Sequence, residues 1–152
     1  MATLLAVDLG LRAGFALYGD DGRLRWYRSQ NFGAQSRMRQ ATHSLLHDLP
    51  DLQWVVLEGG GSLADLWRKA AEPRAIGVIQ TSAEVWRQQL LYPRQQRSGA
   101  DAKQHADQLA RRIIDWSGAP RPTSLRHDAA EAILIGLWGV LQVGWLADVP
   151  VR

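Results

Sequence analysis

The sequence predicts a single-domain α/β protein, residues 1–152, in which helices flank a central mixed five-stranded sheet. Two observations support this. The runs Leu4–Val7 and Trp54–Leu57 are continuously apolar, which is typical of strands covered on both faces. Several other segments repeat apolar residues at helical spacing and alternate with the strands. The chain is also long enough to bury a substantial core.

The N-terminal third predicts three antiparallel strands. The run Leu4–Gly10 is a buried strand that delivers one carboxylate, Asp8, near its end. A second strand is expected at Ala13–Tyr18. The residues Asp20-Asp21-Gly22 then form a turn signal before a third strand at Arg23–Arg28. Short connections of this kind join neighbouring antiparallel strands, so we expect a meander.

The rest of the chain alternates helices and strands. Strands are expected at Leu52–Glu58 and Ile76–Gln80. Helices are expected at Ser36–Leu49, Ser62–Ala71, Ser82–Leu90, Asp101–Trp116 and His127–Val143. Ser62 and Ser82 are candidate N-caps because their hydroxyls can accept from free backbone N–H groups. The segment Tyr92–Gly99 has no periodicity and predicts a mobile basic loop.

The composition narrows the possible functions. Of the 18 basic residues only Lys69 and Lys103 are lysines, so arginine dominates. Guanidinium groups bind phosphate well, which favours a nucleic-acid partner, although a GC-rich genome produces the same bias. The absence of cysteine excludes a thiolate zinc site and suits a reducing compartment. No targeting or membrane-spanning segment is recognisable, so we expect a cytoplasmic protein with no membrane partner.

Four carboxylates stand out by position. Asp8 and Glu58 each end a buried strand, and Asp128 and Glu131 lie one turn apart on one face of the last helix. Asp8 could instead be a turn residue, and the helical pair could simply complement the helix dipole. A ligand set of carboxylates without cysteine favours Mg²⁺ or Mn²⁺ as the bound cation. Two such ions support phosphodiester hydrolysis without a protein nucleophile.

The order of these elements resembles the RNase H-like nuclease fold. Three motifs are similar to the RuvC family of Holliday-junction resolvases: Ala6-Val7-Asp8-Leu9-Gly10, Val56-Leu57-Glu58 and His127-Asp128-Ala129-Ala130-Glu131-Ala132. This resemblance spans nearly the whole chain. It implies a homodimeric, Mg²⁺-dependent endonuclease that cleaves four-way DNA junctions, with Mn²⁺ as a substitute and two ions per active site.

The resemblance also implies roles for individual residues. Asp8, Glu58, Asp128 and Glu131 would be metal ligands, and Lys103, within Gly99–Lys103, would contact phosphate or stabilise developing charge. Basic residues elsewhere would hold the DNA backbone; the expected nucleic-acid-binding set is Arg68, Lys69, Arg94, Arg97, Lys103, Arg111 and Arg112. The preferred cut sequence and any branch-migration partner do not follow from the sequence.

The sequence departs from the family in two places. Glu131 stands where the family usually has Asp, and the connection from Glu58 to Ile76 is shorter than the usual one, in which a long helix helps to form the dimer. An aromatic residue in that connection inserts at the junction in the family. Leu63, Leu66 and Trp67 are the apolar candidates here. His127 could be a further ligand, a proton carrier or a helix cap. Exposed tryptophans, such as Trp67 or Trp26, could stack on bases.

Other functions compete with this interpretation. Sugar kinases and actin-like ATPases also end their first strand in Asp-x-Gly, but they need two large lobes, for which 152 residues leave no room. A related nuclease could act on RNA or on other branched DNA. A third alternative is a nucleic-acid-binding relative that has lost catalysis, although the complete acidic set argues against it.

Overall fold

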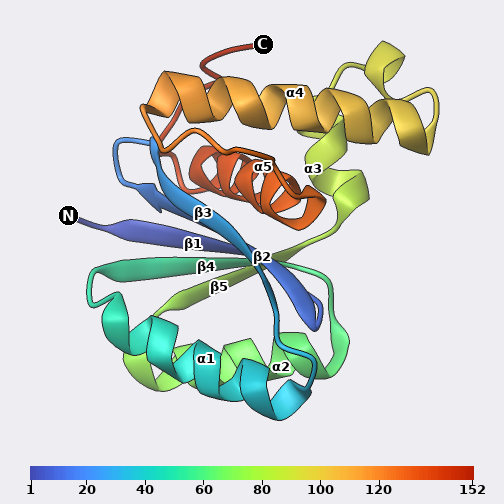
Figure 1. Ribbon diagram of the computed structural model, residues 1–152. Coiled ribbons are helices and arrows are strands. Elements are labelled where there is room, and N and C mark those ends of the chain that lie inside the picture. The colour runs from blue at the N-terminus through green and yellow to red at the C-terminus, as the bar shows by residue number, and fades with distance from the viewer.

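The computed structural model describes all 152 residues as one mixed sheet with helices on both faces (Figure 1). The strands are β1 (Thr3–Asp8), β2 (Arg12–Gly19), β3 (Leu24–Asn31), β4 (Leu52–Glu58) and β5 (Gly77–Thr81). The α-helices are α1 (Gln35–Asp48), α2 (Gly61–Ala71), α3 (Ala83–Leu90), α4 (Gly99–Ser117) and α5 (His127–Gln142). Two short 3-10 helices, η1 and η2, span Glu72–Arg74 and Pro93–Gln95.

The predicted sheet is confirmed. Its strand order is β3-β2-β1-β4-β5, with β1, β2 and β3 antiparallel and β4 parallel to both β1 and β5. The helices α1 and α2 cover one face, and α5 covers the other with α4 stacked outside it (Figure 1). No helix is both long and apolar enough to cross a bilayer.

The structure corrects some local predictions. The third strand continues to Asn31, beyond the expected end at Arg28. The expected loop Tyr92–Gly99 contains η2, and Ser98 caps α4 by accepting from the Asp101 N–H at 3.0 Å. Ser62 is not an N-cap, because α2 begins after Gly60 without a side-chain cap. Ser82 does cap α3, since its hydroxyl accepts from the Val85 N–H at 3.3 Å.

Strand β1 separates two apolar cores. Its side chains alternate, so Leu4 and Ala6 pack on the α5 side, while Leu5 and Val7 pack on the side of α1 and α2. All four are completely buried. This double coverage confirms the prediction of a central buried strand, and it fixes the position of Asp8 at the end of that strand.

Trp67, considered above as an exposed stacking residue, is fully buried. It lies on the side of α2 that packs against the sheet, and the centre of its ring lies 6.2 Å from the centre of the Phe15 ring. Helical position explains the difference, because Trp67 shares the buried stripe of α2 with Ala64 and Ala71. Trp26 is half-buried on the edge strand β3, with the Arg28 guanidinium 4.9 Å from its ring centre.

Helix α5 lies very close to the sheet. A Cβ added at Gly136 would lie 2.3 Å from Cε1 of Tyr18, and one at Gly139 would lie 2.8 Å from a methyl of Val56. The Tyr18 hydroxyl also donates to the Ile133 carbonyl at 2.5 Å in the buried interface. These contacts set the height of α5 above β1 and β2, and therefore the height of its N-terminal turn.

We predict that Gly136→Ala destabilises the protein by about 1–3 kcal/mol, because the Tyr18 ring leaves no room for a methyl group. Chemical denaturation measures this change. The matched control is Gly99→Ala, at the start of α4 where nothing lies within 4 Å, which we expect to be neutral or slightly stabilising. Equal stabilities for both variants would contradict the close approach of α5.

Candidate active site

Asp8 and Glu58 end adjacent parallel strands. They are register partners across β1 and β4, so their carboxylates leave the sheet side by side. Both residues are half-buried. The two strand-end carboxylates identified from the sequence therefore occupy one edge of the sheet.

Helix α5 brings the second pair of carboxylates to the same place. Its N-terminus lies at the end of the molecule where β1 and β4 finish (Figure 1). Asp128 is in the first turn of α5, and Glu131, one turn later, is only 5% exposed. Asp8 lies close enough to Glu58, Asp128 and Glu131 to experience all three negative charges. The fold thus gathers the four predicted site residues.

This crowding changes the acidity of the site. Burial raises the pKa of Asp8 to about 8, and a hydrogen bond with Glu58 and the neighbouring carboxylate charges add to the effect. Burial also raises the pKa of Glu131, against the opposing positive charges of His127 and Arg87. The metal-free cluster is therefore short of positive charge, and Asp8 retains a proton at neutral pH.

Three of the carboxylates are held by donors from other parts of the protein. Trp86 Nε1 donates to Glu58 at 2.7 Å, and Ser29 Oγ donates to Asp128 at 3.2 Å. Glu131 Oε1 receives Arg87 Nη2 at 3.3 Å and lies 3.0 Å from His127 Nε2. The residues in contact with these carboxylates are Ser29, Trp86, Arg87 and His127.

Of these four residues, the sequence singles out only His127, and the structure places it against Glu131. Trp86 is fully buried like a core residue, but its N–H reaches Glu58. Trp86 and Arg87 lie on α3, directly after β5, which is the strand beside β4. Their place in the helix that follows β5 is the sequence signal that could identify Trp86 and Arg87 as neighbours of these carboxylates.

The donor set fits a hard divalent cation. All four carboxylates supply oxygen, and Glu131 Oε2 is buried with no hydrogen-bond partner. A cation would satisfy that atom and relieve the repulsion among the carboxylates. In this conformation no three His, Cys, Asp or Glu side chains form a group that could hold a metal ion. The assignment of all four carboxylates as ligands therefore stays a prediction.

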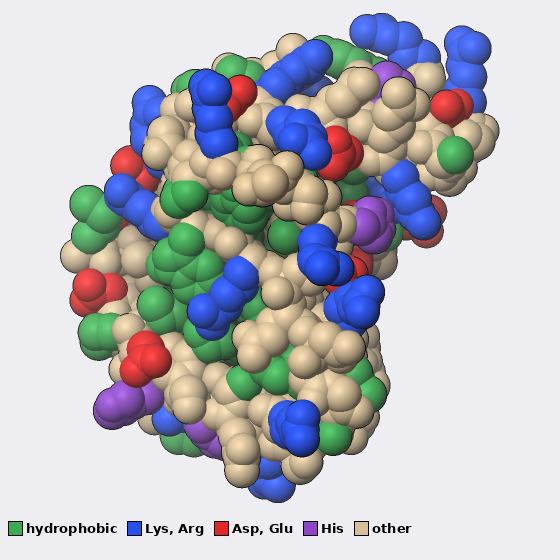
Figure 2. Space-filling view, in the orientation of Figure 1, with side chains coloured by type: hydrophobic (Ala, Val, Ile, Leu, Met, Phe, Trp, Pro, Cys, Tyr) green, Lys and Arg blue, Asp and Glu red, His purple; other side chains and the backbone are tan.

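The predicted phosphate-binding residues lie on two surfaces. Lys103 is exposed in the second turn of α4, and Arg97 is exposed just before this helix. Arg94 stacks over Tyr92, with its guanidinium 4.7 Å from the ring centre. Arg111 and Arg112 are exposed further along α4. Figure 2 shows several Lys and Arg side chains on the upper part of the molecule, where α4 lies.

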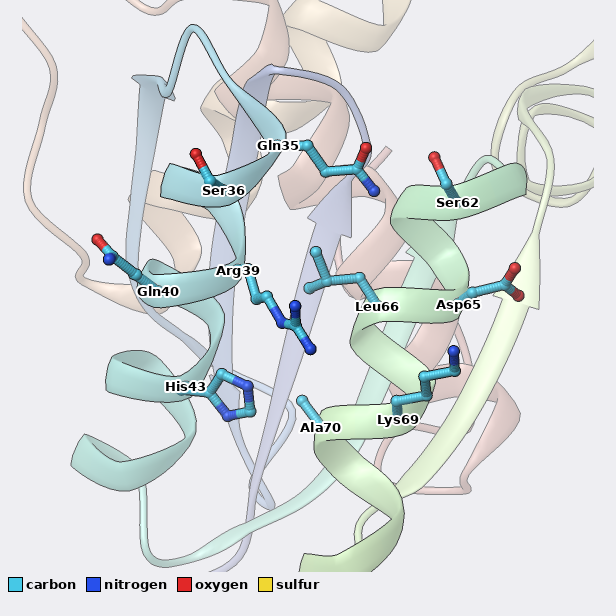
Figure 3. Close-up of a pocket in the computed structure, with 10 residues that line it drawn as sticks. All are labelled: Gln35, Ser36, Arg39, Gln40, His43, Ser62, Asp65, Leu66, Lys69 and Ala70. Carbon is cyan, nitrogen blue, oxygen red and sulfur yellow. The ribbon is translucent and has the colours of Figure 1, made fainter.

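Arg68 and Lys69 lie instead on α2. Arg68 donates to the Gln80 side chain at 2.8 Å, and Gln80 in turn donates to the Gly59 carbonyl at 2.6 Å, so Arg68 braces the loop that follows Glu58. A groove of about 750 Å³ between α1 and α2 is lined by Lys69 but by none of the four carboxylates (Figure 3). Arg39 points into this groove from α1.

The strand order and the helices on both faces of the sheet have the arrangement of the RNase H-like fold. Among solved structures, the chain is similar to RuvC of T. thermophilus in complex with a Holliday junction substrate, with a TM-score of 0.67 and 16% identity over 95% of this chain and 96% of that one. It is also similar to the yeast mitochondrial Holliday junction resolvase Ydc2, with a TM-score of 0.56 and 12% identity over 95% of this chain and 82% of that one. No protein-family model and no curated protein matches the sequence. At these identities the likeness establishes the shared fold.

We predict that Asp8→Asn flattens the pH dependence of stability in the absence of divalent metal. The folded protein keeps a proton on Asp8 up to a pKa of about 8, whereas the ordinary pKa of the residue is 3.8. The free energy of unfolding therefore falls as the pH rises from about 4 to about 8, by at most ~1.4 kcal/mol per pH unit. Asn cannot ionise, so the variant gains stability relative to the parent as the pH rises.

Urea denaturation at pH 5, 7 and 9 with a chelator present tests this prediction. Asp65→Asn, which removes an exposed carboxylate on α2, is the control and should retain the slope of the parent. Identical slopes for the parent and Asp8→Asn would show that ionisation of Asp8 does not lower the stability of the folded protein.

Proposed function

We propose that this chain is a divalent-metal-dependent endonuclease that cleaves four-way DNA junctions. The observation that carries the proposal is the convergence of Asp8, Glu58, Asp128 and Glu131, from two strands and a helix, at one sheet edge. The likeness in fold to RuvC bound to a Holliday junction, and to Ydc2, supports the same substrate class.

The proposed cofactor is Mg²⁺, two ions per active site, with Mn²⁺ as a substitute. Asp8, Glu58, Asp128 and Glu131 would hold it through carboxylate oxygens. When bound, these ions supply a water nucleophile and stabilise the charge on the leaving 3′ oxygen. The chain has no cysteine that could act as a nucleophile in their place.

The remaining residues of the site orient the carboxylates and meet the substrate. Trp86 donates to one oxygen of Glu58, and Arg87 donates to Oε1 of Glu131 beside His127, which leaves Oε2 of Glu131 without a protein partner. Lys103 is exposed at the start of α4, which lies at the same end of the molecule as the start of α5 (Figure 1). We assign it to a phosphate of the bound strand.

Paired cleavage of a junction requires two active sites, and one chain has a single set of carboxylates. We therefore propose a homodimer, whose twofold axis would match the symmetry of the junction. Phosphate contacts alone are unselective, so the distance between the two sites and the shape of the junction would determine the choice of substrate. We further propose that the enzyme acts in the cytoplasm.

We predict that the protein nicks labelled four-way DNA junctions in Mg²⁺ and that Asp8→Asn reduces the rate at least 100-fold, since loss of a ligand carboxylate removes cation binding and its stabilisation of charge. Asp65→Asn is the matched control and should cut like the parent. Product formation on denaturing gels measures the rates. Cutting by Asp8→Asn at the parental rate would exclude Asp8 as a ligand.

Substrate comparison separates the alternatives. The proposal expects junctions to be cut in preference to linear duplex and to RNA at equal concentration. Preferential cutting of RNA would instead identify an RNase H-like nuclease of another class. Binding of junctions without cleavage by the parent, in either Mg²⁺ or Mn²⁺, would identify a binding protein that has lost catalysis.

We predict that Arg97→Gln weakens junction binding several-fold and lowers the slope of log affinity against log salt by about 1, as expected for the loss of one phosphate contact. Arg111→Gln should have less effect, because Arg111 is already paired with Asp107 at 2.9 Å. Fluorescence anisotropy with a junction at several salt concentrations measures both quantities. A larger loss for Arg111→Gln than for Arg97→Gln would place the DNA elsewhere on α4.

A further inference from the structure

A row of register partners crosses the sheet at the level of the carboxylates. Glu58 lies opposite Asp8, Asp8 opposite Gly14, and Gly14 opposite Ser29, so the row spans β4, β1, β2 and β3. Directly opposite residues in a sheet project to the same face. Ser29 therefore belongs to the same surface as Asp8 and Glu58, although it lies on the edge strand.

Gly14 is the one position in this row without a side chain, and α5 uses the space. A Cβ at Gly14 would lie 1.8 Å from the carbonyl oxygen of Asp128 and 2.4 Å from its carbonyl carbon. These atoms are backbone, which cannot move aside as the end of a flexible side chain can. Any side chain at position 14 would therefore push the start of α5 away from the sheet.

Ser29 holds the side chain of the same residue. Its hydroxyl donates to Oδ2 of Asp128 at 3.2 Å in a half-buried setting, across 99 residues of sequence. Asp128 is thus fixed twice, through its backbone over Gly14 and through its carboxylate by Ser29. The hydroxyl occupies one carboxylate oxygen and leaves Oδ1 free.

We propose that Gly14 and Ser29 are positioning residues that hold the backbone and the carboxylate of Asp128 in one orientation beside Asp8, with Oδ1 left for cation binding. This inference rests on the metal site of the proposed function. Without the Ser29 hydroxyl, the carboxylate of Asp128 can turn to other rotamers, and the cation must then order it again. Outer partners of ligand carboxylates typically affect metal affinity 10- to 100-fold.

The test is a Mn²⁺ titration of the DNA-free protein, followed by electron paramagnetic resonance, for the parent, Ser29→Ala and Ser29→Thr. We expect Ser29→Ala to weaken Mn²⁺ binding about tenfold and Ser29→Thr, which keeps the hydroxyl, to restore most of it. Ser44→Ala, at an exposed position on α1, is the matched control and should bind like the parent. Thermal melting confirms that each variant is folded.

Gly14→Ala should weaken Mn²⁺ binding more than Ser29→Ala, because it displaces the backbone of Asp128. In junction cleavage, Ser29→Ala should raise the half-saturating Mg²⁺ concentration about tenfold and leave the rate at saturating Mg²⁺ within twofold of the parent. A purely structural role would lower thermal stability without this separation.

The outcomes distinguish this inference from the proposed function. Equal Mn²⁺ affinity for the parent and Ser29→Ala would overturn the positioning role, whatever the activity. Weaker Mn²⁺ binding by Ser29→Ala, with rescue by Ser29→Thr, would support it even if the parent cuts no junction, a result that would refute the proposed function alone. A parent that binds no Mn²⁺ would overturn both.

Discussion

The structure depends on placing four carboxylates at one sheet edge, an arrangement that like-charge repulsion opposes. Asp8 shows the cost, since burial and its acidic neighbours raise its pKa to about 8. The protein reduces that cost with separate donors: Trp86 to Glu58, Ser29 to Asp128, and Arg87 to Glu131. One oxygen of Glu131 nevertheless remains buried without a partner. A divalent cation is the simplest group that would complete such a site.

Close packing between α5 and the sheet makes this placement possible. Gly14 has no side chain and so leaves room for the backbone of Asp128. Gly136 and Gly139 likewise let the rest of the helix lie against Tyr18 and Val56. The helix is buried at every position from Ala129 to Val140, so it has little freedom to shift along or away from the sheet. The core therefore does more than stabilise the fold, because it sets the height at which the acidic turn of α5 meets the ends of β1 and β4.

Much of this architecture was predictable from local patterns. Continuous apolar runs predict β1 and β4, and the carboxylate at the end of each run marks Asp8 and Glu58 as candidate ligands. The missing parts arise from long-range contacts: Ser29 lies 99 residues from Asp128, and Arg87 lies 44 residues from Glu131. A serine on an edge strand carries no local signal of such a role. Trp67 differs from the prediction because a short helix can turn either face inward, and packing against Phe15 selects the face.

The most direct test of the central claim is anomalous diffraction from crystals soaked in Mn²⁺. We predict peaks within coordination distance of the carboxylate oxygens of Asp8, Glu58, Asp128 and Glu131, with Glu131 Oε2 among the ligands. Such a map would show that the four carboxylates form one cation site. The account would be contradicted if crystals soaked in saturating Mn²⁺ showed no anomalous peak at these carboxylates, or showed peaks only elsewhere on the protein.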